Sequence, residues 1–227
     1  MVWINRDYLD TSSMILKQLA GIRLKSAAQQ RSDMSISLKK NASVSLKKEG
    51  GDGLSAIMLG VGWDVASSGF LGKILGGGGG SIDLDASCIA FDASGGVVDT
   101  VWFQQLVSND RSIRHSGDNL TGEGDGDDES IAIDLTALSA NVETLVLTVN
   151  SFRGQTFDKV KNAFGRVVDS RTNRELARFD ISDTGSHTGL VLASVKRDGG
   201  QWTFKAIGER TTGRTVQDLV SVAARLI

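Results

Sequence analysis

Short segments in which apolar and polar residues alternate follow one another along most of this 227-residue chain. A period of two is typical of half-buried β-strands, because successive side chains of a strand point to opposite faces of a sheet. Glycine, aspartate, asparagine and serine separate the segments, and these residues favour turns. We therefore expect an all-β fold, an antiparallel β-sandwich. The expected strands are MSISL, ASVSLKK, LSAIMLGVGW, SIDLDASCIAF, VVDTVWF, SIAIDL, VETLVLTVNSF, AFGRVVDS, ELARFDI, TGLVLASVKR and QWTFKAIG.

Two segments instead have the spacing of an amphipathic helix. The first lies within residues 10–30, where Ile15, Leu19 and Ile22 recur at helical spacing after several possible N-cap residues. We expect an N-terminal amphipathic helix here and a short C-terminal helix near the end of the chain. The apolar residues of the second helix are Val216, Leu219, Val220 and Ala223.

These patterns divide the chain into a helical extension at residues 1–33, a sandwich domain at 34–210 and a C-terminal helix at 211–227. A glycine-rich stretch at 67–80, which includes the run Gly76–Gly80, interrupts the sandwich. A phosphate-binding loop needs a following helix, whereas the next segment here has a strand pattern. We interpret the stretch as a flexible loop.

The composition excludes several classes of protein. An apolar content of 40% with 23% charged residues is ordinary for a globular chain and excludes a disordered or collagen-like one. Cys88 is the one cysteine, so a disulfide framework and a cysteine-based zinc or iron–sulfur site are excluded, and a reducing compartment is favoured. No run reaches the roughly 18 consecutive apolar residues that a membrane-spanning helix needs. We expect a cytoplasmic protein.

Charge is distributed unevenly along the chain. Residues 83–134 carry twelve acidic side chains against two arginines, although the whole chain has a net charge of only −2. Six of these acids lie within residues 118–129, which contain no lysine or arginine. Such a run is either a solvated loop or a cation site. Oxygen ligands, flexible glycines and the absence of histidine and cysteine favour Ca²⁺. The spacing does not match an EF-hand, because Leu120 and Gly122 occupy positions that an EF-hand gives to Asp or Asn.

A second acidic element lies upstream in the sequence SIDLDAS. If this segment is a strand, Asp83, Asp85 and Ser87 share one face, while Leu84 and Cys88 point the other way. The two carboxylates are either part of a polar sheet face or ligands of an ion that the 118–129 segment helps to bind. Cys88, on the apolar side, is expected in the core rather than as a redox centre.

The acidic run belongs to a long and unusual motif, GDNLTGEGDGDDE, at residues 117–129. With this motif at its centre, the chain resembles the TerD family of tellurium-resistance and stress-response proteins over residues 34–209. Family sequences begin near the position of Met34, so residues 1–33 are an extension. The other matching segments, in unbroken order, are IDLDAS, FRGQTFDKVKNAFGRVV, ELARFDISD and WTFKAIG.

This resemblance implies a β-sandwich that binds calcium, with two ions held by the two acidic elements and by glycine carbonyls. It also implies membrane-associated or regulatory protein partners and no established enzymatic reaction. Which acid binds which ion is left open. The metal-ligating residues carried over by position are Asp83, Asp85, Asp118, Asn119, Glu123, Asp125, Asp127, Asp128 and Glu129.

The function expected from these observations is that of a calcium-binding stress protein acting as a non-enzymatic binding or assembly module. The alternative is a calcium-dependent structural protein that forms a homo-oligomer or filament through residues 1–33. A Mg²⁺- or Mn²⁺-dependent phosphoryl enzyme is less favoured, because the sequence supplies no phosphate-binding loop and no positioned base. Structural or surface roles are expected for His115 and His187. Nucleic-acid binding is not expected, since the largest charge feature is acidic, and no small-molecule substrate is identified.

Overall fold

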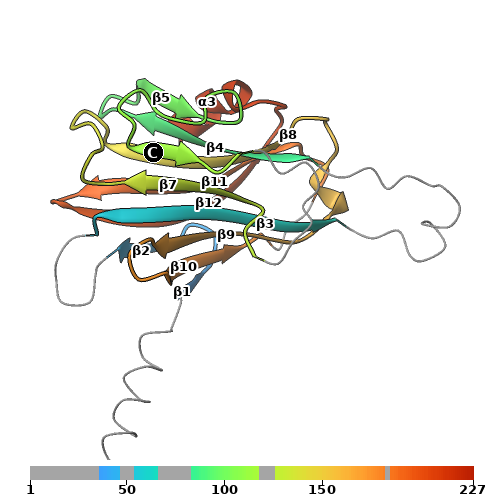
Figure 1. Cartoon of the computed structure of the whole chain (residues 1–227). Coiled ribbons are helices and arrows are strands. Elements are labelled where there is room, and N and C mark those ends of the chain that lie inside the picture. The colour runs from blue at the N-terminus through green and yellow to red at the C-terminus, as the bar shows by residue number, and fades with distance from the viewer. Residues whose placement is uncertain (1–35, 47–53, 66–82, 118–125, 182–184) are drawn as a thin grey trace, which may run out of the picture. The chain divides into compact units, whose positions relative to one another are not determined.

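The computed structural model describes residues 36–46, 54–65, 83–117, 126–181 and 185–227 (Figure 1). These residues form two six-stranded β-sheets, named sheet A and sheet B below. In spatial order, sheet A consists of β1 (Ile36–Leu38), β10 (Arg174–Asp180), β9 (Val160–Asp169), β3 (Ala56–Val65), β7 (Glu129–Asp134) and β6 (Ile113–His115). Sheet B consists of β2 (Ser43–Leu46), β12 (Gln201–Thr211), β11 (Gly189–Asp198), β8 (Thr144–Ser151), β4 (Leu84–Phe91) and β5 (Val97–Val101). A 3₁₀ turn, Phe157–Lys159, precedes β9.

The expected all-β sandwich is confirmed, with one correction to the antiparallel topology. β1 pairs in parallel with β10, whereas the other strand pairs are antiparallel. The strand that follows β1 in sequence, β2, lies in the other sheet, so the two form no hairpin. β1 therefore pairs with a strand far away in sequence, and the alternation of side chains does not encode the direction of such a pairing.

The core lies between the two sheets and follows the predicted alternation. Leu84, Ala86 and Cys88 of β4 belong to it, together with residues such as Leu59 of β3 and Ile131 of β7 from the opposite sheet. The other face of β4 is therefore the outer face of sheet B. The prediction that Cys88 is a core residue is confirmed, since its side chain is fully buried.

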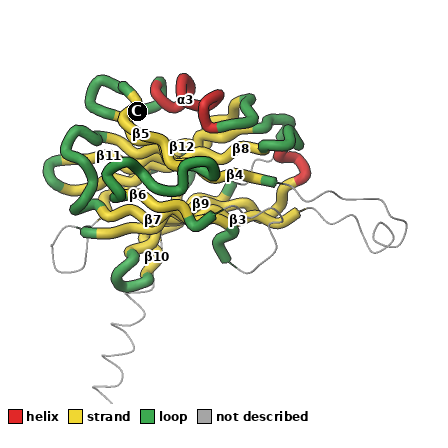
Figure 2. The backbone as a smooth tube through the Cα atoms, turned by 45° about the horizontal axis from the view of Figure 1, so that its top comes forward, coloured by secondary structure: helices red, strands yellow, loops and turns green. Residues whose placement is uncertain are grey.

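A second, smaller apolar cluster lies on the outer face of sheet B. Ile89 and Phe91 of β4 contribute to it, and the helix α3 (Val216–Ala224) covers it with Val216 and Ala223 (Figure 2). Asp218, the third residue of this helix, caps its N-terminus by accepting a hydrogen bond from the backbone N–H of Thr215 at 3.1 Å. The C-terminal helix predicted from its spacing is confirmed, and it packs onto the sandwich.

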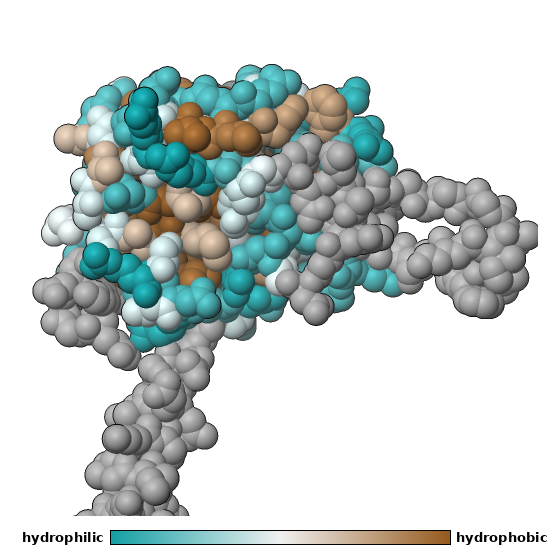
Figure 3. Space-filling model, in the orientation of Figure 1, coloured by the Kyte–Doolittle hydropathy of each residue, from teal (hydrophilic) through white to brown (hydrophobic). Residues whose placement is uncertain are grey.

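The exterior of the described residues is mostly hydrophilic on the face drawn in Figure 3, with apolar residues between polar ones. No helix among the described residues is long and apolar enough to span a bilayer. The predicted N-terminal helix and the Gly76–Gly80 run lie outside the described residues. Large apolar side chains with substantial exposure are Ile36, Val97, Leu106, Val107 and Phe152.

Candidate metal site

Five of the nine predicted ligands belong to the described part of the chain. They are Asp83, Asp85, Asp127, Asp128 and Glu129. The other four, Asp118, Asn119, Glu123 and Asp125, lie outside the described residues.

Asp83 directly precedes β4, Asp85 is its second residue, and both side chains lie on the outer face of sheet B. Both side chains are buried, with only 5% and 4% of their surface exposed. Asn150 of β8 lies opposite Asp85 in the strand register and is 1% exposed. Its Nδ2 donates to Asp85 Oδ2 at 3.2 Å and to the backbone oxygen of Arg214 at 2.8 Å. Arg153, just beyond β8, donates from Nε to Asp83 Oδ2 at 3.1 Å.

Two oxygens of this group stand out because they are buried without a hydrogen-bond donor from any described residue. They are Oδ1 of Asp83 and Oδ1 of Asn150. Leaving such an acceptor unsatisfied costs about 1–3 kcal/mol, and more when the group is charged. A cation bound by oxygen ligands would satisfy both atoms, so the donor set fits a hard metal ion such as Ca²⁺.

Glu129 points in a different direction, into the space between the sheets. It is the first residue of β7 and lies opposite Val61, a residue of the core. Its Oε2 accepts a hydrogen bond from the backbone N–H of Ala86 at 2.7 Å. β5 pairs with β4 only from Cys88 onward, so it does not reach this N–H. The carboxylate of Glu129 therefore supplies the hydrogen-bond acceptor that a neighbouring strand would otherwise provide.

His115 completes this contact between the sheets. The backbone N–H of Gly117 donates to its Nδ1 at 3.0 Å, so the ring proton lies on Nε2. Nε2 is 3.0 Å from the backbone oxygen of Ala86 and 3.4 Å from Oε2 of Glu129. Both polar backbone atoms of Ala86 are thus bound by side chains of sheet A. These contacts hold His115 inside the sandwich, where its ring links the two sheets.

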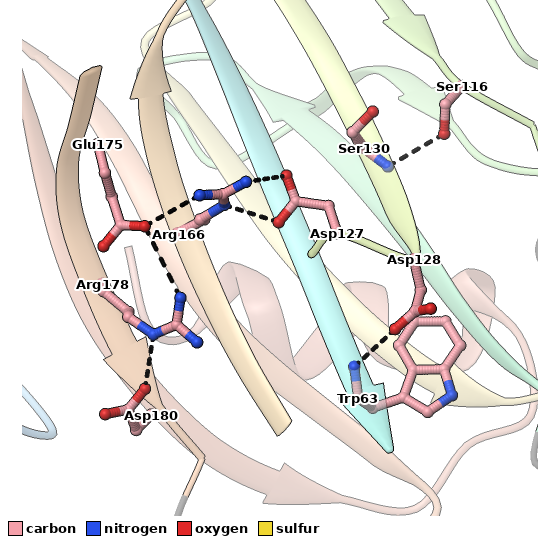
Figure 4. A network of polar contacts seen from close by, with 9 residues as sticks. All are labelled: Trp63, Ser116, Asp127, Asp128, Ser130, Arg166, Glu175, Arg178 and Asp180. Carbon is pink, nitrogen blue, oxygen red and sulfur yellow. Dashed lines mark hydrogen bonds and ion pairs between the residues drawn. The ribbon is translucent and has the colours of Figure 1, made fainter. Parts of the chain in front are cut away.

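Asp127 lies on the outer face of sheet A, over β3 (Figure 4). Arg166 of β9 binds both of its carboxylate oxygens, at 2.7 and 3.0 Å, and also donates to Glu175 at 3.1 Å. The hydrogen bond with Asp127 is the main reason why the pKa of Arg166 is raised. A Cβ at Gly60 would lie only 2.3 Å from the Asp127 carboxyl group, so a larger residue there would force the Asp127 side chain to move.

Asp128 lies between Asp127 and Glu129 in sequence. Its backbone N–H donates to Val61 O at 2.9 Å, and its Oδ2 accepts from the backbone N–H of Trp63 at 2.7 Å (Figure 4). Burial raises the pKa of Asp128, and the negative charges of Asp64, Asp127 and Glu129 raise it further. A nearby cation would offset these negative charges and so lower the pKa of Asp128.

The described ligands therefore do not converge on one point. Asp83 and Asp85 lie on the outer face of sheet B, Glu129 lies between the sheets, and Asp127 lies on the outer face of sheet A. In the described ranges, no group of three or more histidine, cysteine, aspartate or glutamate side chains is arranged to hold a metal ion.

Sequence reasoning missed three residues whose side chains contact predicted ligands, namely Asn150, Arg153 and Arg166. Asn150 is a buried polar residue in a strand whose sequence is otherwise largely apolar, and this was the available signal. Arg153 and Arg166 gave no signal, because a single arginine in or beside a strand is ordinary.

Comparison with known proteins places the chain in a family. Residues 34–222 match the TerD domain. The tellurium resistance protein TerZ of Serratia marcescens is 53% identical over 187 residues, which cover 82% of this chain and 95% of that protein. The stress response protein SCP2 of Bacillus subtilis (strain 168) is 41% identical over 198 residues, which cover 83% and 98%.

A similar fold occurs in a solved structure. The crystal structure of a homologue of the telluride resistance protein TerD, SCO6318 from Streptomyces coelicolor A3(2), superposes with a TM-score of 0.60 at 23% identity. The match covers 74% of this chain and 96% of that one, and it supports the sandwich fold alone. The domain match and the two relatives show that the chain belongs to the TerD family.

Proposed function

We propose that this chain is a cytoplasmic calcium-binding protein of the tellurium-resistance and stress-response type, which acts as a non-enzymatic binding or assembly module. Family membership supports the biological role, since relatives carry the names tellurium resistance protein and stress response protein. Calcium binding is supported by the chemistry of the buried oxygens described above. The two supports are independent of each other.

The observation that carries the proposal is the pair of buried oxygens without a donor among the described residues, Oδ1 of Asp83 and Oδ1 of Asn150. Asp83, Asp85 and Asn150 would hold the ion from the outer face of sheet B. Ca²⁺ takes six to eight oxygens, so three residues do not complete its shell. The remaining predicted ligands are Asp118, Asn119, Glu123 and Asp125.

Arg153 supplies positive charge to this group in the absence of metal. Its Nε lies 3.1 Å from Oδ2 of Asp83, and its side chain is 50% exposed. The guanidinium can therefore move from Asp83 into solvent without any rearrangement of the core. We infer that a calcium ion and Arg153 compete for the same carboxylate.

The non-enzymatic part of the proposal rests on how the histidines are used. His115 is held between Ala86 and Gly117 and contacts Glu129, which are the contacts of a structural residue. His187 is buried with its ring centroid 4.7 Å from that of Phe157. Neither arrangement presents an imidazole to a substrate.

Thermal unfolding with and without calcium tests the proposal. Ligand present at a hundred times its Kd stabilises the folded state by about 2.7 kcal/mol, so CaCl₂ should raise the Tm and a chelator should lower it. Asp83→Asn and Asn150→Leu should reduce this calcium-dependent shift, while Asp180→Asn, on sheet A, should leave it intact. Native mass spectrometry of the same samples reports the number of ions and the assembly state. An identical Tm in calcium and chelator, together with no calorimetric binding heat, contradicts the proposal.

A further inference from the structure

A small cavity lies on the outer face of sheet B, away from the acidic residues. Its volume is about 290 Å³. Thr144, at the start of β8, lines it, whereas Asn150 lies six residues later on the same strand, about 20 Å away at the usual rise per residue. The cavity is therefore separate from the proposed calcium site. Its lining consists of Ser43, Thr144, Ser194, Lys196, Arg197, Asp198, Thr203, Lys205, Leu226 and Ile227.

Two lysines on adjacent strands line this cavity. Lys196 of β11 lies opposite Thr203 of β12, and Lys205 is two residues further along β12. Such diagonal neighbours on one face of a sheet lie about 7–8 Å apart, and like charges at this range repel. Neither lysine forms an ion pair within the described residues, and Lys205 is half-buried.

The other charges around the cavity do not neutralise these lysines. Arg197 and Asp198 have opposite signs, and the guanidinium of Arg197 stacks on Trp202 at 4.5 Å. The carboxyl end of α3 contributes at most about half a negative charge. Lys196 and Lys205 therefore face the cavity without an ion-pair partner among the described side chains, and a bound anion would offset their mutual repulsion.

The remaining lining residues fit an anion that carries an apolar group. Four hydroxyl side chains line the cavity, and a hydroxyl can donate a hydrogen bond to an oxyanion as a lysine does. Leu226 and Ile227 supply an apolar wall. The volume is close to the lower end of the range for small-molecule sites, about 300–1,000 Å³. The hydroxyl residues are Ser43, Thr144, Ser194 and Thr203.

We propose that this cavity binds a small organic phosphate. Lys196 and Lys205 hold the phosphoryl group, the hydroxyls donate to its remaining oxygens, and Leu226 and Ile227 contact the organic part. This site does not depend on the calcium proposal, because it shares no residue with it.

Binding of phenyl phosphate, measured by calorimetry with a calcium chelator in the buffer, tests the inference. We expect Lys196→Gln and Lys205→Gln each to weaken binding about tenfold, because each removes a charge-assisted hydrogen bond. Lys161→Gln is the matched control, since Lys161 is an exposed lysine of β9 in sheet A, and it should bind like the unaltered protein. Inorganic phosphate should bind more weakly than phenyl phosphate, because it has no group for the apolar wall.

Three results would overturn the inference. One is equal binding by all four proteins, which indicates general attraction to positive charge. Another is the absence of binding to the unaltered protein at millimolar phenyl phosphate. The third is inorganic phosphate binding as tightly as phenyl phosphate. Circular dichroism of each variant verifies folding, and the exposed Lys196 keeps the test valid if the half-buried Lys205 proves necessary for stability.

Discussion

Glu129 Oε2 lies 2.7 Å from the backbone nitrogen of Ala86, so a carboxylate of sheet A accepts a hydrogen bond from the main chain of sheet B. The acceptor side chain is 1% exposed, and His115 adds a second contact from sheet A to the same residue. A buried carboxylate of this kind is stable only while its partners remain in place. Glu129, the last residue of the acidic segment, is therefore a structural link between the sheets.

Replacing Glu129 by alanine should strongly destabilise the fold. Glu129→Ala leaves the N–H of Ala86 without an acceptor, so we expect the free energy of unfolding to fall by about 3 kcal/mol. Glu129→Gln keeps an acceptor oxygen and should cost less. Urea denaturation measures both. Glu209→Ala, which removes an exposed ion pair with Lys40, is the control and should cost no more than about 1 kcal/mol. Equal losses in Glu129→Ala and Glu209→Ala would disprove the structural role.

The sandwich was predictable because most of its strands are long enough to display a period of two. The sequence shows Asp83 and Asp85 on one face of β4 with Leu84 on the other, and the structure confirms this. β6 was not predicted, because a three-residue strand such as Ile113–His115 has no visible period. The direction of β1 was not predictable either, since its partner is distant in sequence.

The candidate site was only partly predictable, for a geometric reason. Asp127 and Glu129 are two residues apart, and in a continuous strand they would share a face. The strand begins only at Glu129, so this rule does not apply to Asp127, which lies on the outer face while Glu129 lies in the interior. The composition of a motif thus indicates its chemistry, but where the strand begins decides which side chains meet.

Asp127 should not contribute to calcium binding, although it belongs to the acidic motif. Arg166 binds both of its oxygens, at 2.7 and 3.0 Å. We expect Asp127→Asn to lower the free energy of unfolding by about 1–2 kcal/mol through the loss of these charged hydrogen bonds. Its calcium-dependent shift in Tm should match that of the unaltered protein, unlike that of Asp83→Asn. Loss of the shift in Asp127→Asn would instead make Asp127 a ligand.

Removal of Arg153 should strengthen calcium binding. Its guanidinium contacts Asp83 at 3.1 Å and repels a divalent cation bound there. At low salt this repulsion is worth about 1 kcal/mol, which corresponds to a several-fold lower Kd in Arg153→Gln. Calorimetric titration at two salt concentrations measures the effect, which should shrink at high salt. Arg178→Gln, on sheet A, is the matched control. Unchanged or weaker binding in Arg153→Gln argues against competition at Asp83.

Asp110 should make stability depend on pH in the acid range. Burial acts to raise the pKa of Asp110, but hydrogen bonds from Ser112, Ser108 and the backbone N–H of Ser139 outweigh it and hold this pKa at about 2, below the ordinary value of 3.8. Because the pKa is lowered in the folded state, the stabilisation is present above pH 3.8 and is lost as the pH falls toward 2.

We expect Asp110→Asn to be less stable than the unaltered protein by about 1 kcal/mol at pH 6, a value reduced for solvent screening of this exposed side chain. The difference should narrow as the pH approaches 2. Urea denaturation in chelator at several pH values measures it. If the difference in the free energy of unfolding between the two proteins stays constant with pH, the hydrogen bonds do not favour the ionised carboxylate of Asp110.

Cys88 should be chemically inert in the folded protein. Its side chain is fully buried on the inner face of β4, and burial, with a smaller contribution from the charge of Asp99, raises the pKa of the thiol to about 12. Since the thiolate is the reactive form, a thiol reagent at pH 8 should label Cys88 only when the protein unfolds. The labelling rate should therefore rise with urea in parallel with the unfolded fraction, and fully denatured protein, the control, should react at once. Rapid labelling without denaturant would mean that the edge of sheet B near β5 opens locally while the rest of the sandwich stays folded.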